Sequence, residues 1–329
     1  MTATAWETQN DNRLESAPVG VAEGAMSHRS LAGVLALCVA SWFPAHFAGQ
    51  QAAPGPALKN SKPPELSAPS PNPGEDSLRR FRHALPAEGM ADDLRMRLLA
   101  DHGAILAARG GATPPPTILF ADEDAVKNWH ATVKSERVEI AGITLELQTP
   151  ALEALMNART EVRKIHLDIT PRASDAARRT YADTVTLWRS RVHPGLRHWV
   201  NKGRLTRAEA RRIRALPPAA QVPEILRLEA AGLFLGRKFS RSILYSAAPP
   251  GASQHIAMLA LDINEHGHRS VRTILARHGW FQTVQFDLPH FAYLGSREDE
   301  LPALGLKKIM TGDRDFRVLD LAPASGGAK

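Results

Sequence analysis

Seven prolines crowd the stretch between residues 51 and 74 and divide the chain into two unequal parts. A segment so rich in proline and so poor in large apolar side chains cannot recover the entropy lost on ordering. We therefore predict a disordered linker over residues 50–76. The sequence able to build a core lies beyond it, so the folded body is predicted to span residues 77–329.

The part before the linker, residues 1–49, has the pattern of an export signal. Arg29 precedes an apolar run from Leu31 to Phe43, which is too short to cross a bilayer comfortably. This pattern opens at Met26, and we predict that translation starts there. We expect an exported protein of the periplasm or cell envelope. If the segment is not cleaved, it would instead anchor the protein to the inner membrane.

The folded body is basic and lacks cysteine. Beyond residue 49 the chain carries 39 Lys and Arg against 30 Asp and Glu. A basic surface favours an anionic partner: nucleic acid, a lipid headgroup or a cell-wall polymer. Export disfavours nucleic acid, and we predict no nucleic-acid partner. Cys38, the single cysteine, lies within the apolar run. Disulfides within the chain, a multi-cysteine zinc ribbon and a cysteine nucleophile are thereby excluded, so a metal site must use His and carboxylate ligands.

Hydrophobic periodicity predicts an α+β fold for the body. Apolar residues at helical spacing predict helices within 77–110, 122–135, 150–165 and 175–192, and strands are predicted at 117–120 and 165–170. Alternating residues over 138–148 predict a hairpin. Thr206 with Glu209 forms a capping-box signature for a helix over 207–215, inside a predicted helical insertion at 194–246. The architecture expected is a small, mainly antiparallel sheet flanked by helices, with helical additions.

The residues that carry chemistry lie between 247 and 295. His255 precedes an apolar run predicted to be a buried strand, and Asp262 stands near the end of that strand. A carboxylate buried there needs a partner. Asp287 and His290 follow three residues apart, with Pro289 stiffening the chain between them. Two imidazoles and one carboxylate suit Zn²⁺, with a fourth position left for water, and a further carboxylate nearby suits a general base.

The order of these residues matches a known pattern. The stretch S-x-H-x-x-x-x-A-x-D followed by [D/E]-x-x-H resembles the zinc D-alanyl-D-alanine carboxypeptidase family, the VanY-like branch of the LAS peptidoglycan metallopeptidases. The residues that carry the resemblance are Ser253, His255, Ala260, Asp262, Asp287 and His290. The family also places an arginine after an upstream strand, where this chain has Arg172.

The resemblance implies a role for each matching residue. It implies that His255, Asp262 and His290 bind Zn²⁺ in a peptidase acting on peptidoglycan stem peptides. Asp287 would be the general base. The resemblance further implies that Arg172 binds the substrate carbonyl or carboxylate, and that Ser253 orients the ligand loop or bonds the substrate.

Departures from the family pattern leave the exact activity open. The carboxypeptidases usually have Glu at the position of Asp287, and the D-x-P-H-F pattern looks more like the L-alanyl-D-glutamate endopeptidases. Met258 stands where a glycine is usual, and Arg237 and Arg241 are alternatives to Arg172. The resemblance as a whole still implies a D-alanyl-D-alanine carboxypeptidase. The alternatives are an L-alanyl-D-glutamate endopeptidase and a catalytically silent, zinc-containing wall-binding module.

Overall fold

The computed structural model describes residues 81, 84, 92–285 and 287–321. The chain divides into two units, Met1–Glu65 and Leu66–Lys329, and the described residues all belong to the second. The predicted signal segment with Cys38 and most of the predicted linker lie in the first unit. The whole signal segment and the whole linker lie outside the described residues. No helix within 92–285 or 287–321 has the length and apolar character needed to cross a membrane.

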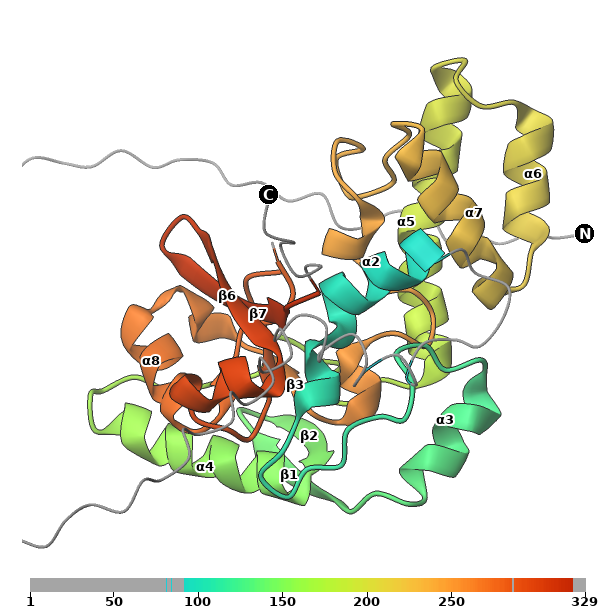
Figure 1. Cartoon of the computed structure of the whole chain (residues 1–329). Helices are drawn as coiled ribbons and strands as arrows, with labels where there is room; N and C mark the ends of the chain where they lie inside the picture. Colours follow the sequence, from blue (N-terminus) through green and yellow to red (C-terminus); the bar gives the residue numbers. More distant parts are fainter. Residues whose placement is uncertain (1–80, 82–83, 85–91, 286, 322–329) are drawn as a thin grey trace, which may run out of the picture. The chain divides into compact units, whose positions relative to one another are not determined.

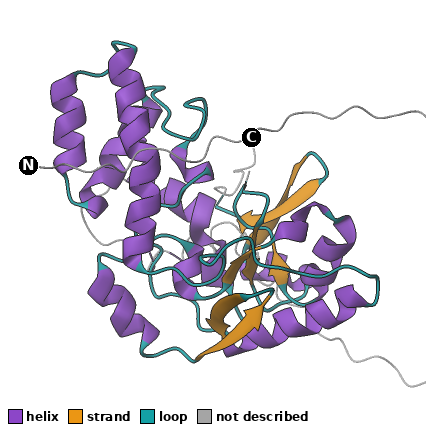
Figure 2. Ribbon diagram, turned by 180° about the vertical axis from the view of Figure 1, so that it is seen from behind, coloured by secondary structure: helices purple, strands orange, loops and turns teal. Residues whose placement is uncertain are grey.

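The described part is an α+β structure with helices around small antiparallel sheets (Figures 1 and 2). Its α-helices are α2 (Asp92–His102), α3 (Glu123–His130), α4 (Thr149–Arg163), α5 (Tyr181–Asn201), α6 (Arg207–Ala215), α7 (Pro218–Ala230) and α8 (Arg269–Arg277). Its strands are β1 (Ser135–Ile140), β2 (Ile143–Gln148), β3 (Ala260–Asp262), β4 (Trp280–Phe281), β5 (His290–Tyr293), β6 (Leu306–Thr311) and β7 (Arg314–Leu319). Short 3₁₀ turns connect them: η2 (Gly103–Ala107), η3 (Ile243–Tyr245), η4 (Gln254–Ala257), η5 (Asn264–Gly267) and η6 (Glu298–Leu304).

The strands form two hairpins and one three-stranded sheet. β1 pairs with β2 and β6 pairs with β7, while the third sheet has the order β3-β5-β4, with every pairing antiparallel. Ala141 and Gly142 make the β1–β2 turn with positive φ angles of 52° and 76°, a turn in which glycine carries no steric penalty. The hairpin predicted over 138–148 is confirmed, as is the α+β class.

Helix starts follow the capping chemistry of the sequence. Thr206 and Glu209 form the predicted capping box, and α6 spans the predicted 207–215. The helix predicted at 175–192 instead begins at Tyr181, because Thr180 and Asp183 form a second capping box there. Neither predicted strand at 117–120 or 165–170 forms. In the second of these stretches His166 adopts a left-handed φ of 59°. The nearest strand-like contact there is an isolated bridge between Pro171 and Ile263.

Apolar burial is divided among separate clusters. One cluster unites the β1–β2 hairpin, α4, α8 and the three-stranded sheet, and includes the fully buried Trp280 and Phe291. A second cluster is built around Trp188 and fills the space between α5, α6 and α7. The first cluster therefore supports the sheet that carries the predicted site, whereas the second gives the helical segment a core of its own.

A buried carboxylate fixes the loop that follows α7. Glu229 is 3% exposed and accepts bonds from the backbone nitrogens of Leu235 (3.0 Å) and Ile243 (2.7 Å) and from the Ser242 hydroxyl (2.6 Å). Breaking one of these bonds would leave a buried charge short of a partner, which is costly. The carboxylate therefore holds the groups that donate to it in fixed positions. The loop is thereby held where its last residues, near Leu244, reach the predicted site.

Candidate metal centre

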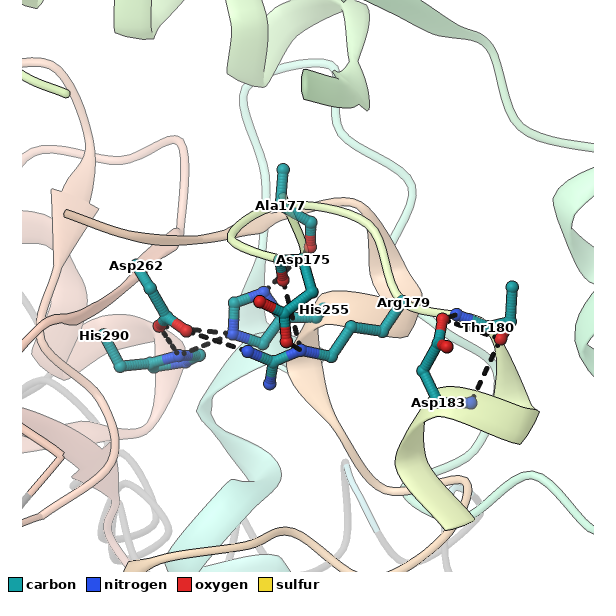
Figure 3. Close-up of polar contacts among 8 residues, drawn as sticks. All are labelled: Asp175, Ala177, Arg179, Thr180, Asp183, His255, Asp262 and His290. Carbon is teal, nitrogen blue, oxygen red and sulfur yellow. Dashed lines mark hydrogen bonds and ion pairs between the residues drawn. The ribbon is translucent and has the colours of Figure 1, made fainter. Parts of the chain in front are cut away.

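Two strands bring two of the predicted ligands face to face. β3 pairs with β5 so that Asp262 stands directly opposite His290. His255 comes from η4, the 3₁₀ turn that precedes β3. Both imidazoles are buried, at 2% and 3% exposure, and the Asp262 side chain is 17% exposed. The three side chains that the sequence selected therefore lie together at one end of the sheet (Figure 3).

The three ligand atoms form a nearly equilateral triangle. His255 Nε2 lies 3.1 Å from His290 Nδ1 and 3.3 Å from Asp262 Oδ1, and His290 Nδ1 lies 3.2 Å from Asp262 Oδ1. In a tetrahedral zinc site with ligand bonds near 2.0–2.1 Å, two ligand atoms are about 3.3 Å apart. The triangle therefore has the size of one face of a zinc tetrahedron, before any metal is added.

Hydrogen bonds outside the triangle turn both ring lone pairs inward. His255 Nδ1 lies 2.8 Å from the carbonyl oxygen of Ala177, which only accepts, so Nδ1 carries the proton and Nε2 is free to ligate. His290 Nε2 lies 2.8 Å from Gln254 Oε1. The Gln254 amide is itself oriented, because its nitrogen donates to the His102 carbonyl (2.9 Å) and its oxygen accepts from the Thr283 hydroxyl (2.8 Å). His290 Nδ1 is thereby left without a proton.

The arrangement thus presents three acceptor atoms to one another. Burial lowers the pKa of His255, so a proton is a poor occupant of the space between them. Burial alone would raise the pKa of Asp262, but the adjoining His255 and His290 hold it well below its ordinary value. Deprotonated nitrogens and an ionised carboxylate are the states that a metal requires of its ligands. The donor set fits Zn²⁺, and it is the single group of this kind among the residues that the structure describes.

Arg179 is a site residue that sequence reasoning missed. Its Nη2 donates to Asp262 Oδ2 at 2.9 Å, and its Nε donates to the Asp175 carboxylate at 3.2 Å (Figure 3). The bond occupies one oxygen of Asp262 and leaves Oδ1 for the triangle. Outer hydrogen bonds of this kind orient a ligating carboxylate. Arg179 lies in an Ala-Ala-Arg-Arg run that gives no sign of it, since its partner is 83 positions away.

The predicted substrate arginine lies elsewhere. The Arg172 backbone nitrogen donates to the Asp262 carbonyl at 3.0 Å, which places the residue beside β3, but its side chain is exposed. It does not line the cavity next to the triangle, and neither do the alternatives Arg237 and Arg241. Arg179 does line that cavity. The role predicted for Arg172 therefore stays a prediction.

A small cavity adjoins the triangle. It has a volume of about 40 Å³, and the predicted base Asp287 and the predicted loop residue Ser253 line it together with both site histidines. Asp287 is half-buried, and Ser253 is 8% exposed. A space of this size holds roughly three water molecules, since each needs about 10–15 Å³. Four of the predicted site residues thus line one small cavity together with Arg179.

His102 lines the same cavity, and no pattern in the sequence marks it as a site residue. It is 3% exposed and ends α2. Its ring bonds the Leu244 backbone, while Nε2 has no hydrogen-bond partner. Burial and the nearby His290 lower the pKa of His102 to about 3. The ring is therefore neutral at any pH at which the site could bind a metal.

The lowered pKa of His102 predicts acid sensitivity of the fold. Between pH 6.5 and about 3 the unfolded chain protonates this residue and the folded chain does not, so its contribution to stability is full above 6.5 and falls as the pH drops through this window. Over this window the free energy of unfolding of the His102→Leu variant should fall less steeply with pH than that of the original chain, by up to about 1.4 kcal/mol per pH unit. Denaturant unfolding at pH 7, 6, 5 and 4 measures this. Parallel stability curves for the variant and the original chain would contradict it.

The role of Gln254 predicts a loss of metal affinity without loss of a ligand. Gln254→Leu removes the acceptor that holds His290 Nε2, so Zn²⁺ should bind about 10–100-fold more weakly. Gln221, a glutamine of α7 that is 1% exposed, gives a matched control in Gln221→Leu. Calorimetric titration with Zn²⁺ compares the two variants. Equal affinities would show that His290 needs no such orientation.

The described fold is an α+β structure with a His–Asp–His group able to hold a metal ion. Two solved structures match the chain in part. One is a mutant of the vancomycin-resistance D,D-pentapeptidase VanY from a VanB-type cassette, in complex with Zn(II), with 15% identity and a TM-score of 0.31 over 58% of this chain and 87% of that one. The other is VanYB in complex with D-alanine-D-alanine, with 14% identity and a TM-score of 0.32 over 53% and 86%. No family model and no curated protein matches the sequence.

Proposed function

We propose that this chain is a zinc-dependent peptidoglycan peptidase that removes the terminal D-alanine of stem peptides. The observation that supports the proposal most is the triangle of His255, Asp262 and His290, whose inward lone pairs and 3.1–3.3 Å spacing suit Zn²⁺. The order of the same residues in the sequence resembles the carboxypeptidase motif. Geometry and motif select the same three side chains by independent routes.

Each residue has a proposed task. Bound zinc would supply Lewis acidity, which lowers the pKa of water and polarises a peptide carbonyl. Asp287 lies in the adjoining cavity, where it would take a proton from the attacking water and return it to the leaving amine. Arg179 and Gln254 hold Asp262 and His290 in place. Arg172 remains the proposed contact for a substrate carboxylate or carbonyl, because it adjoins β3.

Product analysis tests the proposal and decides which bond is cut. The full chain, loaded with zinc, is incubated with pentapeptide muropeptides, and the products are identified by mass. Loss of one terminal alanine, abolished by a chelator, is the expected result. Cleavage after L-alanine would establish the endopeptidase alternative. Detection of the mature N-terminus in an envelope fraction would test the proposed export separately.

One observation favours the silent wall-binding module as a second candidate. The cavity of about 40 Å³ beside the triangle is far smaller than the roughly 300–1,000 Å³ of sites that bury a small-molecule ligand. A peptidase with this structure must widen the site to admit a stem peptide. Zinc bound tightly without cleavage of any muropeptide would establish the module.

A further inference from the structure

The positive charge of the described chain is concentrated in one segment. Residues 181–246, which contain α5, α6 and α7, carry 13 Lys and Arg against 4 Asp and Glu. The flanking residues 92–180 and 247–321 together carry 20 against 22. The body that holds the metal centre is therefore close to neutral, and the net charge of +9 belongs to the helical segment alone.

Within this segment, arginines gather around one histidine. Arg189, His193 and Arg197 follow at intervals of four residues on α5, and Arg214 of α6 donates through Nη2 to the His193 carbonyl at 3.2 Å. All four side chains are exposed. The three arginines make no ion pair with a described residue. We call these four residues the α5–α6 basic cluster.

The three arginines act electrostatically on the histidine between them. Burial lowers the pKa of His193, and Arg214, Arg189 and Arg197 lower it further. Arg189 and Arg197 lie eight residues apart on one face of α5, and Arg214 of α6 reaches the same face. None of the three pairs with a described carboxylate, so their mutual repulsion is not offset within the described residues. An anion bound there would remove the repulsion. Arginine is suited to the task, because its planar fork bonds phosphate through two parallel N–H donors.

The surface chemistry narrows the choice of anion. Binding in the plane of a bilayer requires exposed apolar side chains next to the basic ones. The large apolar residues exposed in the described chain are Met156, Ile165 and Met310, all outside the segment. Single-stranded nucleic acids bind by stacking bases on free aromatic rings. Here the Phe239 ring stacks on His198, and the Trp199 indole donates to the Phe234 carbonyl. A repeated phosphate without bases fits better.

We propose that the α5–α6 basic cluster docks a linear polymer of repeated phosphate groups, independently of hydrolysis at the metal centre. For a wall enzyme, such a polymer would hold the chain at its substrate. The inference extends beyond the proposed peptidase activity. The docking proposal is tested by binding alone. The docking proposal and the proposed peptidase activity can therefore fail independently of each other.

The test uses the full chain and fluorescently labelled inorganic polyphosphate. Anisotropy titrations over a salt series compare the original chain with a triple variant, Arg189→Glu, Arg197→Glu and Arg214→Glu. Three exposed cations without ion pairs give a control of equal charge change: Lys127→Glu, Lys164→Glu and Arg269→Glu. Three lost phosphate contacts should flatten the slope of log affinity against log salt by roughly 2 to 3. Affinity at low salt should fall at least about tenfold in the cluster variant, with little change in the control.

Further measurements locate the site and identify its ligand. Polyphosphate should raise the pKa of His193, followed through its ring protons by NMR, because bound phosphate offsets the arginine charges. A triple variant to Gln, which is less disruptive than Glu, should weaken binding in the same direction. Equal losses in the cluster and control variants would overturn the cluster as the site. Tighter binding to duplex DNA, to polyglutamate or to anionic vesicles at equal charge would overturn phosphate polymers as its ligand.

Discussion

Zn²⁺ added to the metal-free chain should raise its thermal midpoint by many degrees, and His255→Ala should abolish the rise. A ligand present at 1,000 times its dissociation constant stabilises the folded state by about 4 kcal/mol. The variant removes one corner of the triangle and leaves two of its three ligands. Differential scanning fluorimetry with and without Zn²⁺ measures the difference.

The matched control for this prediction is a histidine outside the site. His278 bonds the Glu161 carboxylate at 2.9 Å, and His278→Ala should leave the zinc-induced shift intact. A shift retained by the His255 variant, or lost in both, would show that the stabilising metal binds elsewhere. His290→Ala should behave like His255→Ala, because both nitrogens are equally part of the triangle.

Asp287→Asn should separate metal binding from catalysis. The amide cannot accept the proton of the attacking water, so hydrolysis of a pentapeptide should fall about 10²–10⁴-fold. Zinc affinity should stay within a few-fold, since Asp287 lines the cavity without belonging to the triangle. Steady-state rates by mass spectrometry, with zinc content measured on the same samples, give both quantities.

An exposed aspartate provides the comparison. Asp124 lies on the first turn of α3, and Asp124→Asn should alter neither rate nor zinc content. Full activity in the Asp287 variant would assign the base to another residue. Loss of zinc together with activity would make Asp287 part of the metal centre and not its base.

The sequence predicted which three side chains meet, but not what holds them. His255, Asp262 and His290 were selectable because their types and order follow a metal-binding pattern. Arg179 and His102 come from segments remote in sequence from the ligands, and Gln254 acts across the fold, so each contact depends on a geometry that no local pattern encodes. Gln254 adjoins His255 in the chain, yet its contact is with His290, 36 positions away.

Met258 illustrates how a local departure is understood only from the backbone. The family pattern has glycine there, and the structure gives the residue a left-handed φ of 54° after the η4 turn. Glycine adopts this conformation without strain, whereas methionine does so at a cost. The methionine side chain is 1% exposed, so burial offsets that strain. The secondary-structure errors have a similar origin, since residues 165–170 are apolar enough for a strand but lack a partner edge.

The pairing of Asp262 with His290 also bears on how the chain reaches its native state. β3 has three residues and β5 four, so few backbone hydrogen bonds fix their alignment, and burial of the side chains of both strands supplies much of the constraint. Shifting one strand by one position would turn its ligand to the opposite face of the sheet. A metal that needs both ligands on one face is therefore incompatible with a shift by one position. Bound zinc would therefore add its own preference for the native strand pairing, because the shifted pairing cannot present both ligands to one ion.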